Sequence, residues 1–71
     1  MVNSQKIKGR MVERKITQAE LAKAMNLSQP ALNQKINNVR AFTLEEAVYL
    51  QEFLKIDNED FKTYFFADSV A

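Results

Sequence analysis

The sequence predicts an all-α fold, a compact five-helix bundle that forms a single domain over residues 1–71. Beta-branched residues are scattered, and no stretch alternates between apolar and polar residues for long enough to indicate a strand. The chain has one glycine and one proline, so few positions would interrupt regular structure. Residues that cap helices recur along the chain, and 71 residues are enough for one small core.

The first helix is predicted over residues 5–15, with Asn3 or Ser4 as its N-terminal cap. Its inner face is expected to carry Ile7, Met11 and Val12. Gly9 lies inside this helix, where glycine costs about 1 kcal/mol relative to alanine. Close packing of another element is the usual reason for such a glycine.

Two capping boxes predict the second and fourth helices. In TQAE and TLEE, a threonine hydroxyl accepts from the backbone N–H three residues later, and the glutamate returns a bond to the cap. The boxes begin at Thr17 and Thr43, so the helices should cover residues 18–26 and 44–55. Their expected inner residues are Leu21, Ala22 and Met25 in one, and Leu44, Ala47, Val48, Leu50, Phe53 and Leu54 in the other.

Ser28 and Pro30 mark the start of a third helix, over residues 29–37. Serine is a preferred cap, and proline is tolerated in the first turn, where backbone N–H groups lack intrahelical partners. At about 100° per residue, Leu32 and Ile36 share the inner face. The outer face carries no charge and consists of Gln29, Pro30, Asn33, Gln34 and Asn37. This row suits a surface that contacts fixed hydrogen-bond donors and acceptors, and the alternative is a merely solvated polar face.

A fifth helix is predicted over residues 58–66, with Asp57 as its cap. The C-terminal aromatic segment, residues 58–71, contains more rings than one short helix can bury on one face. These rings are Phe61, Tyr64, Phe65 and Phe66. Some are expected to complete the core beneath the first and fourth helices, and others to remain exposed for a homodimer contact.

The net charge of +1 conceals an uneven distribution. Residues 1–40 contain eight basic and two acidic residues, which gives +6. Residues 41–71 contain two basic and seven acidic residues, which gives −5. A basic half joined to an acidic half indicates a polyanionic partner on one side. The alternative is that these charges only solvate the faces of helices.

The composition argues against several classes of function. The chain has no cysteine and no histidine, so no metal and no cofactor are predicted. Without those residues or a glycine-rich loop, no nucleophile, general base or phosphate cradle is apparent, so neither an enzyme nor a small-molecule substrate is expected. No membrane-spanning apolar run or signal peptide is apparent, which favours a cytoplasmic location and no membrane partner.

Two strings, TQAELAKAMNLSQPALNQKINN and FTLEEAVYLQEFL, carry a resemblance to a known class of proteins. They resemble the phage repressor and Cro class of helix-turn-helix regulators. Within that class the chain is most similar to small Cro-like regulators from phages and prophages of Gram-positive bacteria. The resemblance extends from about residue 6 to residue 68. It implies a lambda-repressor-like DNA-binding domain, with residues 18–37 as the helix-turn-helix proper.

The resemblance also implies a function. A homodimer would bind double-stranded operator DNA at an inverted repeat, in the nucleoid of a bacterial host, and would act as a transcriptional repressor. The implied base-contacting residues are Gln29, Pro30, Asn33 and Gln34. The implied phosphate-contacting residues are Gln18, Ser28, Asn37, Asn38 and Arg40, and Lys6, Arg10, Arg14 or Lys15 could add to them. Gln18 would also brace the third helix.

Three residues depart from the pattern of that class. Asn26 and Asn38 stand where glycine is frequent, and asparagine is the non-glycine residue that best tolerates positive φ. Lys35 stands where many members bury an apolar residue. Its stem could lie along the edge of the core with the ammonium outside, or Ile36 could supply the packing instead.

A second function is compatible with the same fold. The chain could be a protein-interaction module, such as an antirepressor or an antitoxin-like partner, that uses its aromatic segment. A strong dependence of DNA binding on salt would favour the regulator, and a weak one the interaction module.

Overall fold

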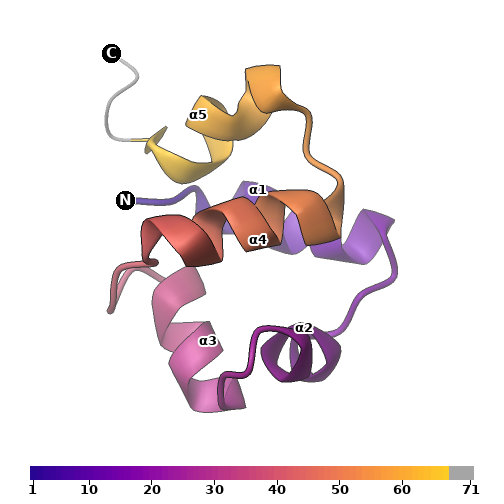
Figure 1. The fold of residues 1–71 in the computed structure, drawn as a ribbon, viewed down its shortest axis with the longest axis vertical. Helices are drawn as coiled ribbons and strands as arrows, with labels where there is room; N and C mark the ends of the chain where they lie inside the picture. The colour runs from indigo at the N-terminus through magenta and orange to yellow at the C-terminus, as the bar shows by residue number, and fades with distance from the viewer. Residues whose placement is uncertain (68–71) are drawn as a thin grey trace.

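The computed structural model describes residues 1–67, and this part of the chain forms five α-helices and no β-strand. The elements are α1 (Ser4–Glu13), α2 (Gln18–Ala24), α3 (Gln29–Ile36), α4 (Leu44–Leu54), a 3₁₀ turn η1 (Asn58–Asp60) and α5 (Phe61–Phe65). The predicted all-α class and the five helices are confirmed. At one end of the molecule lie α2 and α3, and at the other lies α5, with α1 and α4 between them (Figure 1).

Each of the first four helices begins at a side-chain cap. Asn3 Oδ1 accepts from the backbone N–H of Lys6 at 3.1 Å, which decides between the two caps predicted for α1. Both capping boxes, at Thr17 and Thr43, are present with both of their bonds. Ser28 Oγ accepts from the backbone N–H of Ala31 at 3.2 Å. These predictions of helix starts are confirmed.

The same four helices end one or two residues before their predicted ends. Within residues 1–67, each is followed by a residue in the left-handed region. These residues are Lys15 (φ 57°), Asn26 (φ 57°), Asn38 (φ 65°) and Lys55 (φ 55°). After each one, the next backbone N–H bonds back to a carbonyl five residues earlier, for example from Val39 to Gln34 at 2.8 Å. This arrangement satisfies carbonyls at the helix end and turns the chain sharply.

The core is formed by one apolar stripe from every helix. Its fully buried large side chains are Ile7, Leu21, Leu32, Ile36, Leu50 and Leu54. Met11, Ala22, Ala47, Ile56 and Phe65 are also buried in this cluster, and Met25 and Phe53 are half-buried against it. A chain of this size has little other apolar surface to bury, so these side chains provide most of the driving force for folding.

Several predictions about buried residues are wrong. Val12 is 77% exposed, Leu44 is 70% exposed and Val48 is 41% exposed. In α4 the buried line is Ala47, Leu50 and Leu54, and Leu44 and Val48 project about a quarter-turn or more away from it. No element of residues 1–67 covers that side of α4. Leu44 and Val48 therefore form an exposed apolar surface beside the buried line of this helix.

Two further predictions require correction. A Cβ built on Gly9 would have no neighbour within 4 Å, so close packing does not account for this glycine. The predicted fifth helix is divided into η1 and α5, and the side chain of Asp57 makes no capping hydrogen bond. Residues 68–71 of the predicted aromatic segment lie outside the described residues.

An N-terminal strap, residues 1–3, joins the two ends of the molecule. The side-chain amide of Asn38 accepts from Val2 N–H at 2.8 Å and donates to the Val2 carbonyl at 3.0 Å. Asn3 N–H donates to the carbonyl of Tyr64 at 2.8 Å. The strap therefore connects the turn after α3 with α5.

Candidate nucleic-acid interface

The helices α2 and α3 correspond to the predicted helix-turn-helix, residues 18–37. Four residues, 25–28, connect these helices, and Asn26 adopts the left-handed conformation that the turn requires. Ala22 and Leu32 are buried where the two helices pack together.

The two faces of α3 differ as predicted. Leu32 and Ile36 are fully buried. The exposed residues of α3 and its C-terminal cap are Gln29, Pro30, Asn33, Gln34 and Asn37, and none of them is charged. The structure therefore brings all four predicted base-contacting residues together on one exposed surface, named here the amide face.

Hydrogen bonds connect the amide face with α2 and α1. Asn33 Nδ2 donates to Gln18 Oε1 at 3.4 Å, which is the brace expected between α2 and α3. Asn37 Nδ2 donates to the Asn33 carbonyl at 3.0 Å and to Asn33 Oδ1 at 3.2 Å. Lys8 Nζ donates to Asn37 Oδ1 at 2.8 Å. These four residues form a continuous polar chain, which we name the amide ladder.

Lys8 is a residue that the sequence analysis missed. The other lysines and arginines of α1 were considered as additions to the phosphate contacts, and Lys8 was not. Its partner Asn37 lies 29 residues away in the sequence, so no local pattern could have identified the pair. In the fold, however, Lys8 is the cation of α1 that is bonded to the amide face.

Other cations of α1 have partners away from the amide face. Arg10 donates from Nε to the Leu54 carbonyl at 2.8 Å and from Nη2 to the Lys55 carbonyl at 2.6 Å. Its charge therefore stabilises the C-terminal end of α4. Lys6 lies over the ring of Tyr64, with Nζ 5.3 Å from the ring centroid. Both residues have contacts within the fold that explain their presence.

The turn after α3 combines structural and exposed residues. Arg40 is exposed, as a phosphate contact requires. Asn38 is different, because its amide holds the N-terminal strap and its φ of 65° forms the end of α3. Ser4 Oγ also donates to the carbonyl of Ile36 nearby. Asn38 thus fixes the C-terminal end of α3 through contacts inside the chain.

Lys35 is buried between α3 and the start of α4, with its ammonium on Glu46. Only 7% of its surface is exposed, and its ammonium contacts both carboxylate oxygens of Glu46, at 2.5 and 2.7 Å. The expectation that the ammonium would lie outside is wrong, and Ile36 is buried as well. Burial raises the pKa of Glu46, but hydrogen bonds from Lys35 and Thr43 and the lysine charge outweigh it, so its pKa lies below the ordinary value of 4.5.

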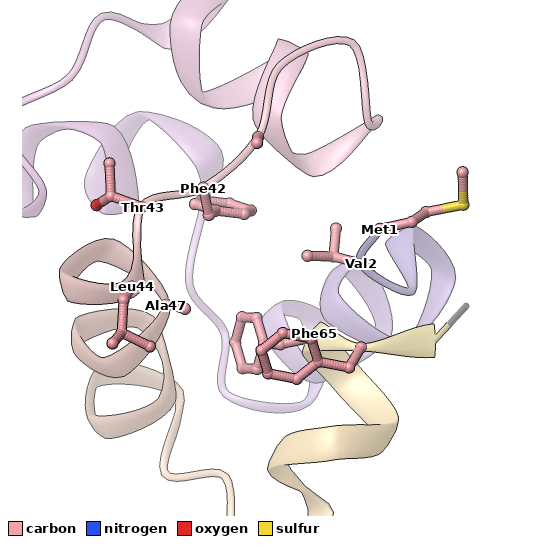
Figure 2. A pocket seen from close by; sticks show the side chains of 9 residues that line it. Met1, Val2, Phe42, Thr43, Leu44, Ala47 and Phe65 are labelled. Carbon is pink, nitrogen blue, oxygen red and sulfur yellow. The ribbon is translucent and has the colours of Figure 1, made fainter. Parts of the chain in front are cut away.

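The aromatic rings of the C-terminal segment belong mainly to the core. Phe65 is buried, and Phe61 and Tyr64 are half-buried against the same cluster. Phe66 remains 44% exposed. Beside it, a hollow of about 260 Å³ opens between the N-terminal strap, residues 41–44 and α5. Figure 2 shows Val2 and Phe65 at this hollow, from separate segments of the chain.

Comparison with known families identifies the chain at the level of its family. Residues 2–68 match the model of a family described as Protein of unknown function (DUF739). The chain belongs to the DUF739 family. No curated protein and no solved structure matches this DUF739 chain significantly. The family description specifies no activity, so the geometry of the amide face is the basis for a functional assignment of this DUF739 protein.

Two structural features bear on other classes of function for the DUF739 chain. Among residues 1–67, no group of three or more aspartate or glutamate side chains is arranged to hold a metal ion. No helix in that part of the chain has the length and apolar character needed to cross a bilayer.

Proposed function

We propose that this protein binds double-stranded DNA sequence-specifically, as a Cro-like transcriptional regulator of a phage or prophage. In this proposal α2 and α3 are the two helices of a helix-turn-helix, over residues 18–37, within a lambda-repressor-like domain. The observation that carries the proposal is the amide face, an exposed and uncharged surface on a helix whose other side is buried. In a chain with 27% charged residues, such a surface is unusual for a face that only contacts water.

The chemistry of the amide face suits the major groove of DNA. Base pairs present hydrogen-bond donors and acceptors there, and asparagine or glutamine pairs with the N6 and N7 edge of adenine. Gln29, at the start of α3, and Asn33, one turn later, are the candidates for adenine. Pro30 offers an apolar surface for a thymine methyl group, and Gln34 completes the base-contacting set. These contacts favour half-sites that contain A·T pairs.

Phosphate contacts would fix the register of α3 on the duplex. Gln18, Ser28 and Asn37 border the amide face, and Arg40 is exposed just beyond α3. The bond from Lys8 to Asn37 supports the addition of Lys8 to this group. It makes Asn38 a residue that holds the backbone in place, since its side-chain amide bonds to Val2.

A second copy of the chain is the proposed partner in DNA binding. One short helix in one groove gives limited affinity, and helix-turn-helix proteins of this kind bind two half-sites about one turn of DNA apart. Because Phe65 is buried, the predicted dimer contact through the aromatic segment is reduced chiefly to Phe66. The exposed side chains of Leu44 and Val48 supply the additional apolar surface, and Leu44 lines the same hollow as Phe66.

Selection of bound duplexes from a random DNA pool, at near-physiological salt, tests the proposal. We expect enrichment of an inverted repeat whose half-site centres lie about one helical turn apart. Binding that is salt-sensitive but enriches no sequence would contradict sequence-specific regulation. Repetition with Asn33→Ala and Gln29→Ala would then show which base pairs α3 contacts.

One observation favours the interaction module as the second candidate. The outward side of α4 carries Leu44, Val48 and Tyr49, with Glu45 and Glu52 between them, around one shallow groove. An apolar surface interrupted by carboxylates suits a protein partner and repels DNA. DNA binding with a weak salt dependence, together with an intact fold, would favour this candidate.

A further inference from the structure

Lys8 and the backbone carbonyl of Asn33 together set the direction of each hydrogen bond in the amide ladder. A lysine ammonium can only donate hydrogen bonds, so the group of Asn37 that faces it must be the oxygen. Lys8 Nζ indeed lies 2.8 Å from Asn37 Oδ1. The –NH₂ group of Asn37 is thereby turned towards Asn33, where it bonds to Oδ1 at 3.2 Å and to the carbonyl at 3.0 Å.

The ladder then determines how Asn33 is presented. An –NH₂ group can only donate, so Asn33 must offer its oxygen to Asn37 and its own –NH₂ to Gln18, 3.4 Å away. A side-chain amide has two N–H donors and two acceptor lone pairs. One donor and one acceptor are used within the ladder. One N–H and one lone pair therefore remain available, in a fixed order along α3.

Adenine requires this combination. In the major groove it presents the N7 acceptor and the N6 donor side by side, whereas guanine presents two acceptors. We propose that Asn33 selects adenine in one orientation, and that Lys8 is the positioning residue that fixes the order of its donor and acceptor through Asn37. This inference rests on the proposed DNA-binding function and names the base that Asn33 contacts and the residue of α1, Lys8, that orients Asn33.

The test measures discrimination at one base pair. That pair is the position of the selected operator at which Asn33→Ala abolishes preference. The ratio of affinities for adenine and for the other bases there should be about 5- to 150-fold in the unmodified protein. Lys8→Met should reduce this ratio at least about threefold, because only the Asn33 carbonyl then holds the Asn37 amide in its orientation. Lys8→Arg should retain it, since arginine also only donates, whereas Lys8→Gln should not.

Two variants make the test specific. Asn37→Asp keeps an acceptor for Lys8 but removes the donor to Asn33, so it should lose discrimination as Lys8→Met does. Lys6→Met is the matched control, because it removes the same charge from the same helix at a position over Tyr64. It should lower affinity for all duplexes alike, if at all, and leave the ratio unchanged.

A measurement without DNA checks the ladder itself. The side-chain amide resonances of Asn33 in the free protein should shift in Lys8→Met and remain in place in Lys6→Met. Unchanged resonances, or full adenine discrimination in Lys8→Met, would overturn the role of Lys8 and leave DNA binding intact. A protein that prefers no sequence at all would overturn the proposed function instead, so the two failures are distinguishable.

Discussion

Gly9 illustrates how much a single residue can matter in a domain of this size. It lies inside α1, and a Cβ at this position would meet nothing within 4 Å. Glycine loses more backbone entropy on folding than alanine does, and it exposes the helix backbone to water. The position therefore weakens α1 without a compensating contact in residues 1–67.

Gly9→Ala should therefore stabilise the protein. We expect an increase of about 1 kcal/mol in the free energy of unfolding. This corresponds to a rise of about 4–8 °C in Tm for a domain of this length. Thermal or urea unfolding followed by circular dichroism measures it. A loss of stability would mean that some neighbour requires the absence of a side chain there.

At the same scale, substitutions on the amide face should change sequence specificity, and substitutions at its border should change affinity for all DNA alike. Gln29→Ala is expected to cost about 1–3 kcal/mol on the preferred operator and to relax specificity at the contacted base pair. Arg40→Ala should weaken binding to all sequences similarly and reduce the salt dependence. Titration of each variant with operator and scrambled duplexes distinguishes the two effects. A loss for Arg40→Ala on one sequence alone would refute its phosphate role.

At the scale of the helix, the C-terminal ends of the first four helices share a source of backbone strain, a residue with positive φ. In residues 1–67 the left-handed positions after the first four helices hold Lys15, Asn26, Asn38 and Lys55, and none is glycine. For L-residues this conformation costs roughly 1–2 kcal/mol, although asparagine tolerates it better than most. The two lysines are therefore the most strained of these ends.

Lys15→Gly should relieve this strain. Glycine adopts positive φ freely, but it also adds about 0.4–1 kcal/mol of unfolded-state entropy that folding must remove. The net gain in the free energy of unfolding should be roughly 0.5–1 kcal/mol. Asn26→Gly, measured by the same urea titration, is the comparison and should gain less. Destabilisation by Lys15→Gly would show that the lysine side chain contributes a compensating contact.

Helix starts could be predicted because their determinants are local. The bonds of Thr17, Ser28 and Thr43 each span three residues, so sequence spacing alone specifies them. The division of α3 into two faces is equally local, because it follows from the helical period. Positive φ at Asn26 and Asn38 was expected because they stand where the resembled class often has glycine, and the same conformation at Lys15 had no such signal.

The remaining features depend on contacts between distant segments. Leu44 and Val48 are exposed because no element of residues 1–67 packs on their side of α4, and a hydrophobic pattern does not report which side receives a neighbour. Lys8 bonds to Asn37 across 29 residues, and Asn38 bonds to Val2 across 36. Such pairs are fixed by the tertiary arrangement, so the amide ladder was not predictable from the sequence.

The ion pair of Lys35 and Glu46 links α3 to the capping box of α4. Because the pKa of Glu46 in the folded state lies below 4.5, its charged form is favoured by folding. The resulting stability is present above the unfolded pKa and is lost as the pH falls through the lowered folded value.

The corresponding prediction concerns acid stability. The free energy of unfolding should decrease as the pH falls below about 4.5, and Glu46→Gln should flatten this decrease while lowering stability at neutral pH. Urea titrations at a series of pH values measure both effects. Glu45→Gln, an exposed neighbour in the same helix turn, is the matched control and should have little influence. An equal pH dependence in Glu46→Gln would contradict the role of the pair.

The whole molecule has two regions of opposite net charge. The basic half, residues 1–40, contains α1, α2 and α3, and the acidic half contains α4 and α5. Figure 1 shows α2 and α3 at the end opposite α5. In the proposed complex, the acidic region would lie away from DNA phosphates, and the side of α4 near the N-terminal strap would meet the second copy.

A change on that side should alter assembly without altering the fold. Leu44→Glu should lower the dimer fraction, measured by analytical ultracentrifugation, and weaken operator binding at least about tenfold, because two half-sites would no longer be bound together. Val12→Glu is the matched control for the dimer fraction alone, since Val12 is a comparably exposed apolar side chain on α1 but lies beside Lys8 and Gln18. If both variants remained dimeric, the dimer surface would lie elsewhere on the molecule.

The N-terminal strap also bears on the order in which tertiary contacts form during folding. Its bonds join Val2 to Asn38 and Asn3 to Tyr64, so they span 36 and 61 residues and can form only after the helices between them have packed. Contacts that form late in folding are commonly among the first to open. Hydrogen exchange at the Val2 and Asn3 amides should therefore be faster than at the Leu50 amide. It would report local opening of the N-terminal strap from Asn38 and Tyr64.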